Sequence, residues 1–197
     1  NGCTLDGGTT SGKAALTNYG TVTIQDSKEN GTIKRSDTGG NAYYTIQNEG
    51  IMTIKSGTVY NNSGEEPPAW SGSSLICNAA SRDTTRAVLN IEGGIFSQKN
   101  FIAIKNDEYG GVLNISGGII QSNTQAVQNW GTANITGGDL TGAVTTWTYF
   151  STNATTNITG GVIDGDIQAT KLTYSGKPAT NRPTVKISGN ANIQGKF

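Results

Sequence analysis

The stretch "AVQNWGTANITGGDL", residues 126–140, contains the features that decide the fold. Its apolar residues alternate with polar ones, as they do in a strand that buries one face. Asn129 is followed two residues later by a glycine, which marks a first turn, and Gly137-Gly138 marks a second. The stretch therefore predicts two short strands, each ended by a glycine turn.

The same arrangement recurs along the chain. Clear copies are "TIQNEGIMTIKSGTV" (45–59), "AIKNDEYGGVLNISGGII" (103–120) and "TNATTNITGGVI" (152–163), and weaker ones lie at 16–26, 75–96 and 184–193. No helical periodicity persists over the roughly ten residues that a helix needs. Repeats of about 20–30 residues with short strands predict an all-β fold, a single-stranded parallel β-helix of about seven coils. From the general rule for parallel crossovers we expect the β-helix to be right-handed.

Three columns of residues follow from aligning the copies. The asparagine column holds Asn18, Asn48, Asn78, Asn106 and Asn129, with Thr152 in the sixth place. The isoleucine column holds Ile24, Ile54, Ile91, Ile115, Ile135, Ile158 and Ile187, and a third column holds Val59, Phe96, Ile120, Leu140 and Ile163, with Ile33 and Ile193 as looser members. We expect the apolar columns to stack as the core and the asparagines to form a hydrogen-bonded ladder between coils.

Variation in repeat length predicts where the chain leaves the rod, since insertions in a solenoid form loops. The longest predicted insertions are 25–33, 34–43, 61–74, 79–86, 144–151 and 172–183. We expect one domain over 1–197, with a cap or first coil in 1–14, regular coils in 15–171 and a terminal coil in 172–197.

Composition narrows the function. Fourteen basic and 14 acidic residues give zero net charge, which indicates neither nucleic-acid binding nor a membrane-surface patch. No apolar run approaches the about 18 residues of a membrane span. The chain has no histidine, the commonest general base and metal ligand. Its two cysteines, Cys3 and Cys77, make neither a disulfide framework nor a zinc site, and whether they pair stays open. We expect no metal and no cofactor.

The Asn-x-Gly turns, the "NISGG" and "NITGG" corners and the closing "PTVKISGNANI" resemble pectate-lyase-like right-handed β-helix modules. Such modules occur in surface proteins of Gram-positive gut bacteria and in fibre or appendage proteins of their phages. The resemblance covers residues 15–195. It implies an extracellular protein, on a bacterial surface or a phage virion, that adheres to host or cell-surface glycans.

Some relatives of this fold are polysaccharide lyases or hydrolases, so catalysis is an alternative. It would need clustered carboxylates for calcium or a carboxyl pair about 5–9.5 Å apart. The candidates are Asp139, Asp164 and Asp166. Asp164-Gly165-Asp166 is typical of a turn, and Asp139 takes a place that Ile119 and Val162 hold in neighbouring copies. We therefore assign no catalytic residue and expect a binding module; a purely structural fibre segment is the other alternative.

Aromatic residues are the better candidates for a binding site, because flat rings stack on the apolar faces of sugars. Tyr19 and Trp130 follow ladder asparagines at turns that point away from the core, while Trp147 and Tyr149 lie in the predicted insertion 144–151. We expect Trp130, Trp147 and Tyr149 to form an exposed patch for a glycan, with Tyr19 and Trp70 as further contacts. The alternative is that the insertion folds over the turn and the rings pack together.

A second surface feature is apolar. Ile51, Val88 and Val112 occupy one outward position on consecutive copies. Contiguous exposed apolar residues often mark an interface. We expect either a loop that covers them or a contact between subunits, for example in a homotrimer.

Overall fold

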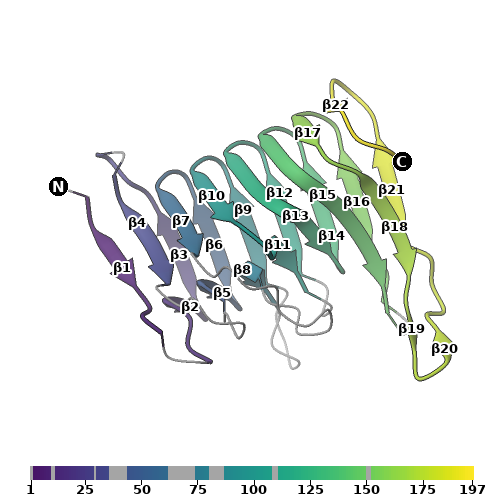
Figure 1. The fold of residues 1–197 in the computed structure, drawn as a ribbon, viewed down its shortest axis with the longest axis horizontal. Helices are drawn as coiled ribbons and strands as arrows, with labels where there is room; N and C mark the ends of the chain where they lie inside the picture. The colour runs from purple at the N-terminus through teal and green to yellow at the C-terminus, as the bar shows by residue number, and fades with distance from the viewer. Residues whose placement is uncertain are drawn as a thin grey trace.

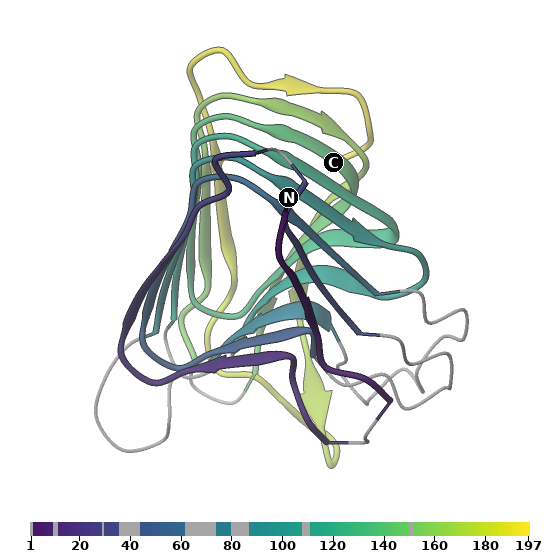
Figure 2. The same ribbon diagram turned by 90° about the vertical axis from the view of Figure 1, so that its left-hand side faces the viewer.

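The computed structural model describes residues 2–9, 12–28, 30–35, 44–61, 74–79, 87–107, 111–149 and 152–197. They form a right-handed parallel β-helix of about seven coils, as predicted (Figure 1). Each coil contributes one strand to each of three faces, so the chain winds around a three-sided prism when seen along the stack (Figure 2). In every coil the chain passes from face 1 to face 2 and then to face 3.

The three faces are defined by their strands. Face 1 contains β2 (Leu16–Asn18), β5 (Ile46–Asn48), β8 (Ser74–Asn78), β11 (Ile102–Asn106), the second parts of β13 (Ile119–Asn129) and β15 (Asp139–Thr148), and β18 (Ile167–Lys171). Face 2 contains β3 (Thr21–Ile24), β6 (Ile51–Ile54), β9 (Val88–Ile91), β12 (Val112–Ile115), β14 (Thr132–Ile135), β16 (Thr155–Ile158) and β21 (Thr184–Ile187). Face 3 contains β1 (Thr4–Asp6), β4 (Thr32–Arg35), β7 (Thr58–Asn61), β10 (Ile95–Gln98), the first parts of β13 and β15, β17 (Val162–Asp164) and β22 (Asn192–Ile193). Because β13 and β15 continue around a corner, they join faces 3 and 1 into one sheet.

The isoleucine column stacks in register along the whole of face 2. Its five central members, Ile54, Ile91, Ile115, Ile135 and Ile158, are fully buried, and Ile24 is half-buried. Ile187 was predicted in the core, but it is 41% exposed. The reason is that β21 is the last strand of face 2 and has a neighbour on one side alone. The third apolar column also stacks in register on face 3, with half-buried Ile33 and Ile193 at its ends.

The asparagine ladder forms at the corner between faces 1 and 2. Each side-chain Nδ2 donates to the Oδ1 of the next coil's asparagine, at 2.7–2.8 Å from Asn18 through to Asn129. The ladder ends where Asn129 Nδ2 donates to Thr156 Oγ1 at 2.9 Å. The sixth place in the column belongs to Thr146, which pairs in register with Asn129, and the prediction of Thr152 was wrong. Thr152 instead hydrogen-bonds with Tyr149: its Oγ1 accepts from the Tyr149 backbone N–H and donates to the Tyr149 carbonyl.

The Gly-Gly corners between faces 2 and 3 need glycine for two different reasons. At Gly117 an added Cβ would lie 2.4 Å from the Glu92 carbonyl oxygen of the preceding coil, so the coils stack too closely for a side chain. At Gly118 the backbone has φ 91°, a conformation that favours glycine. Equivalent positive φ values recur at Gly94, Gly138 and Gly161, so the corner is repeated from coil to coil.

The predicted insertions 144–151 and 172–183 differ in structure from one another. The prediction that 144–151 leaves the rod was wrong, because Val144–Thr148 belongs to β15 and pairs with β13 on one side and β18 on the other. The segment 172–183 contains an antiparallel hairpin of β19 (Thr173–Tyr174) and β20 (Lys177–Pro178), seen beyond β18 in Figure 1. The predicted insertions 34–43, 61–74 and 79–86 fall almost wholly outside the described residues.

The predicted cap contains a strand. Residues 4–6 form β1 and pair in parallel with β4. Cys3 is exposed, Cys77 is buried, and both are free thiols, which answers the open question of pairing. Within the residues that the structure describes, no helix is long and apolar enough to cross a membrane.

Candidate functional site: an aromatic cluster at the edge of face 1

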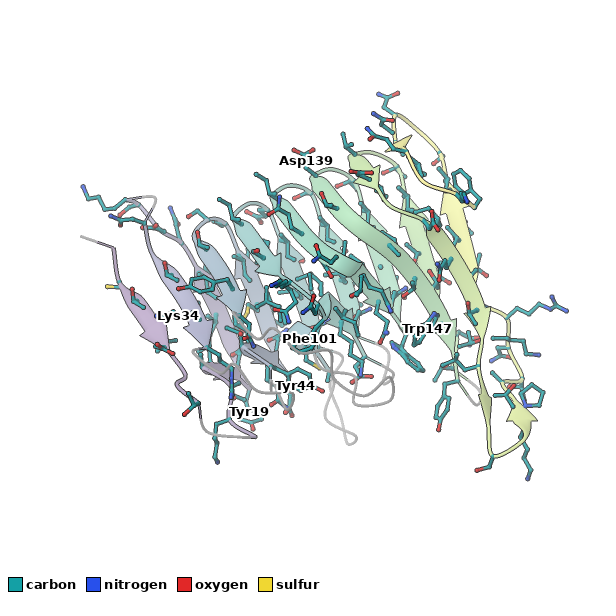
Figure 3. All side chains as sticks on the ribbon, in the orientation of Figure 1. Tyr19, Lys34, Tyr44, Phe101, Asp139 and Trp147 are labelled. Atoms are coloured by element: carbon teal, nitrogen blue, oxygen red, sulfur yellow. The ribbon has the colours of Figure 1, made fainter. Side chains whose placement is uncertain are left out.

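The register of β13 and β15 brings two tryptophans together. Asn129 pairs with Thr146, so the residues that follow them, Trp130 and Trp147, lie beside one another on adjacent coils. Tyr149 lies two residues beyond Trp147, directly after the last residue of β15. These three residues form what we call the aromatic cluster, and Figure 3 labels one of them, Trp147.

The rings of the cluster pack edge to face. The centroids of Trp130 and Trp147 are 5.4 Å apart with an interplanar angle of 76°, and those of Trp130 and Tyr149 are 5.9 Å apart at 79°. This is one of the favoured geometries for aromatic pairs. All three side chains are half-buried. The rings therefore pack against one another and keep part of their surface accessible, but no insertion folds over them, because Val144–Thr148 is a strand.

Charged and amide groups hold Trp130 from the preceding coil and from its own strand. Lys105 Nζ lies 5.9 Å from the centre of the Trp130 ring, within the range of a cation–π contact. The same Nζ is 3.1 Å from Asp107 Oδ2, and both of these side chains are largely shielded from solvent. Trp130 Nε1 donates a 2.8 Å hydrogen bond to Gln128 Oε1. The orientation of the indole ring is therefore set from two directions.

Gln128 is fixed in turn by a small hydrogen-bond network. Its Nε2 donates to Gln125 Oε1 at 3.1 Å, and Thr145 Oγ1 donates to the same oxygen at 2.8 Å. Gln128 and Thr145 are buried, although both occupy positions that face away from the core. The sequence prediction missed this network, because the repeat does not dictate the residue in that column.

Cys77 belongs to the same column, in register with Lys105. Its register with Lys105 places it at a position that faces away from the core, yet its side chain is buried. Burial raises the pKa of the Cys77 thiol to about 12, and the negative charge of Asp107 acts in the same direction. Cys77 Sγ donates a long contact of 3.9 Å to Asp107 Oδ2. The thiol therefore stays protonated at neutral pH and is a packing group beside the Lys105–Asp107 pair.

The indole N–H of Trp147 has no hydrogen-bond partner among the described residues. Trp147 Nε1 is buried and makes no hydrogen bond to the residues that the structure describes, whereas Trp130 Nε1 is paired. Buried donors are nearly always satisfied in folded proteins, so an unpaired one marks a place where another acceptor would be stabilising. The accessible surface of the cluster is therefore ring surface, since the unpaired N–H of Trp147 is itself covered.

The other predicted ligand residues do not join this cluster. Tyr19 is 75% exposed on the first coil, several coils away along the stack (Figure 3). Trp70 lies outside the described residues. The structure therefore brings together three of the five aromatic residues named from the sequence.

The carboxylates considered for catalysis lie elsewhere. Asp139 is exposed on face 3, in register with Ile119 and Val162 as predicted, and at the opposite edge of the stack from Trp147 in Figure 3. Asp164 ends β17 on the same face, and Asp166 accepts a hydrogen bond from the backbone N–H of Lys196. Among the described residues, no group of three or more acidic or cysteine side chains could hold a metal ion.

The apolar row predicted on face 2 is present. Ile51, Val88 and Val112 pair in register on three adjacent strands. Ile51 is 47% exposed, and the two valines are half-buried. The row is thus partly accessible in the isolated chain.

Comparison of the chain with protein-family models, curated proteins and solved structures found no match. The strand pairing and the ladders establish the fold. The function has to be inferred from the chemistry of the surface, and the aromatic cluster is its most distinctive part.

Proposed function

We propose that this chain is a non-catalytic, surface-displayed binding module, whose rigid β-helix presents the aromatic cluster to a glycan of a host or of another cell. The observation that carries this proposal is the pairing of Trp130 and Trp147, edge to face and half-exposed on adjacent coils. Aromatic rings stack on the apolar faces of sugars, and polar groups at their rim bind hydroxyls. Display on a bacterial surface or a phage fibre is the setting that the resemblance of the repeats implies.

The geometry suits such a ligand. Because the indole planes are 76° apart, one ring can lie under a sugar while the other forms a wall beside it. Lys105 and Gln128 hold Trp130 in place before binding, which reduces the conformational entropy lost on association.

The charge of Lys105 is neutralised by Asp107 at 3.1 Å. Lys105 is therefore a support for the Trp130 ring and not a free cation for an acidic sugar. We expect neutral glycans to be preferred at this cluster.

The test is a glycan array followed by calorimetry on the best ligand. The double variant Trp130→Ala/Trp147→Ala is expected to lose binding, while Tyr19→Ala, which removes an exposed aromatic ring on a distant coil, keeps it. Circular dichroism checks that the variants fold. Binding that is unchanged in the double variant would end the proposal for this cluster.

A structural fibre segment is the second candidate, and the exposure of Ile51 at 47% in a row with Val88 and Val112 is the observation that favours it. In this case the row packs against other copies in a homotrimer. Light scattering across a range of concentrations measures the oligomeric state. A chain that stays monomeric at high concentration contradicts this candidate.

A further inference from the structure

Positive charge is concentrated in the last coil of the β-helix, residues 167–197, which contains β18, the hairpin, β21 and β22 (Figure 1). These residues include five lysines or arginines and no acidic residue, which is a side-chain charge of +5. Residues 1–166 contain nine basic and 14 acidic residues, which is a side-chain charge of −5. The zero net charge of the chain is therefore the sum of two regions of opposite sign.

Two of these cations flank the base of the hairpin, and a third lies on it. Lys171 ends β18 and is in register with Thr148 of β15. Thr148 Oγ1 donates a 2.8 Å hydrogen bond to the Asn181 carbonyl, so Arg182 follows directly after a contact with the same threonine. Lys177 lies on β20, one of the two strands of the hairpin. Three positive charges are thus gathered around one end of the last coil.

A fourth cation continues this surface onto face 2. Lys186 lies on β21 in register with Asn157, the last asparagine of the outward row. All four side chains are exposed, and none of them makes an ion pair with another residue that the structure describes. We call these four residues the basic surface: Lys171, Lys177, Arg182 and Lys186.

No carboxylate lies beside the basic surface. The acidic residues beyond position 108 are Asp139, Asp164 and Asp166. The first two lie on face 3, and Asp166 lies at the corner between β17 and β18, where it accepts a hydrogen bond from the backbone N–H of Lys196. The fifth cation, Lys196, is therefore close to a carboxylate. Faces 1 and 2 of the last three coils contain no acidic residue to compensate the other four.

The chemistry of the basic surface restricts its partner. Exposed threonines stand among the cations, at Thr170, Thr173 and Thr184, and their hydroxyls both donate and accept hydrogen bonds. Three of the four cations are lysines, whereas phosphate recognition favours the bidentate fork of arginine. Non-specific binding to duplex DNA commonly uses about 6–10 phosphate contacts, more than four cations supply. Cations interspersed with hydroxyls suit a polymer that carries both anionic groups and hydroxyls.

We infer that the basic surface is a docking surface for a linear acidic polysaccharide. Screening limits the reach of each charge to about 8 Å at physiological ionic strength, so each cation acts on the part of the polymer that lies over it. The surface adjoins the aromatic cluster, because Thr170 is in register with Trp147. It differs from the cluster in acting through charge, since the charge of Lys105 in the cluster is neutralised by Asp107. The inference therefore does not rest on the proposed function.

The experiment titrates the whole chain with dextran sulfate and with neutral dextran of the same length, and follows binding by calorimetry at several salt concentrations. We expect dextran sulfate to bind and dextran not to bind. The affinity should fall with increasing salt, with a log–log slope of up to about four, roughly one for each cation. The triple variant Lys171→Gln/Arg182→Gln/Lys186→Gln should weaken binding about tenfold or more and reduce this slope.

Two controls separate the basic surface from net charge and from the aromatic cluster. The first is a triple variant that removes the same number of charges from exposed lysines on earlier coils, Lys13→Gln/Lys55→Gln/Lys99→Gln. It should bind dextran sulfate with nearly unchanged affinity. The second is Trp130→Ala/Trp147→Ala, which should also keep its affinity for dextran sulfate, so a failure of the proposed function leaves this result intact. Circular dichroism checks that each variant folds.

Four outcomes would overturn the inference. The first two are the absence of binding to dextran sulfate and an affinity that the variant of the basic surface does not change. The third is an equal loss of affinity in both triple variants, which would reduce the effect to net charge. The fourth is tighter binding of duplex DNA than of dextran sulfate at the same salt concentration, which would assign the surface to nucleic acid.

Discussion

Replacing Asn106 by alanine tests whether the inner asparagine ladder stabilises the stack. Asn106 is fully buried. Its Nδ2 donates to the Gly111 carbonyl at 2.9 Å, to Asn129 Oδ1 at 2.8 Å and to the Thr132 carbonyl at 3.2 Å, and its Oδ1 accepts from Asn78 Nδ2 at 2.8 Å. The substitution removes all four contacts at once and leaves a cavity that is closed to solvent.

The magnitude follows from these contacts. A neutral hydrogen bond contributes about 0.5–1.5 kcal/mol net, so four of them give about 2–6 kcal/mol. Some partners keep other bonds: Asn78 Nδ2 still reaches the Val112 carbonyl, and Asn129 Oδ1 still accepts from the Gly131 N–H. We therefore expect the lower half of that range. Since domains are stable by about 5–15 kcal/mol, the loss should be large.

A matched control lies on face 2, where a second asparagine ladder faces outward. Asn134 Nδ2 donates to Asn114 Oδ1 at 2.9 Å, and Asn134 Oδ1 accepts from Asn157 at 2.9 Å, but these side chains are half-buried. Water can replace those bonds, so Asn134→Ala should cost about 0–1 kcal/mol. Urea unfolding followed by circular dichroism gives both values. Equal losses in the two variants, or a loss below about 1 kcal/mol for Asn106→Ala, would refute the reasoning.

Two further predictions concern the core and the buried thiol. Ile115→Ala should lower the free energy of unfolding by about 2–5 kcal/mol, because it opens a cavity in the fully buried column. Ile187→Ala, at a 41% exposed position, should lower it by about 1 kcal/mol or less in the same assay. Similar losses at both positions would contradict the assigned burial. A thiol reagent should label Cys3 in the native protein and Cys77 after unfolding alone. Because burial raises the Cys77 pKa from 9.0 to about 12, the unfolded state releases this proton first, so stability is fully present below pH 9 and falls between pH 9 and 12. Cys77→Ala should remove this part of the loss of stability at alkaline pH. If the variant loses as much stability between pH 9 and pH 11 as the unaltered protein does, the assignment to Cys77 is wrong.

Much of the fold could be predicted from the repeat. The columns that pack in the core and the asparagine ladder need the same residue type at the same place in every coil, and this leaves a pattern in the sequence. The exceptions lie where the pattern breaks. Residues 144–148 carry no Asn-x-Gly turn, so local signals pointed to a loop, while pairing with β13 and β18 makes them a strand.

The candidate site was predicted less completely for the same reason. Trp130 could be singled out because the repeat does not dictate its position, and its nearness to Trp147 was expected. The reason for that nearness is the register of β15, which places Thr146 beside Asn129. Lys105 and Asp107 could not be assigned a role, since a contact between coils depends on that register and not on local sequence.

The sequence by itself determined the parallel β-helix, its number of coils, and the residues that stack within it, because stacking repeats one local environment many times. The tertiary structure alone decided which outward side chains meet. It paired Trp130 with Trp147 and buried Cys77 against Asp107. Such contacts occur once in the chain and involve residues far apart in sequence, so no periodic pattern records them.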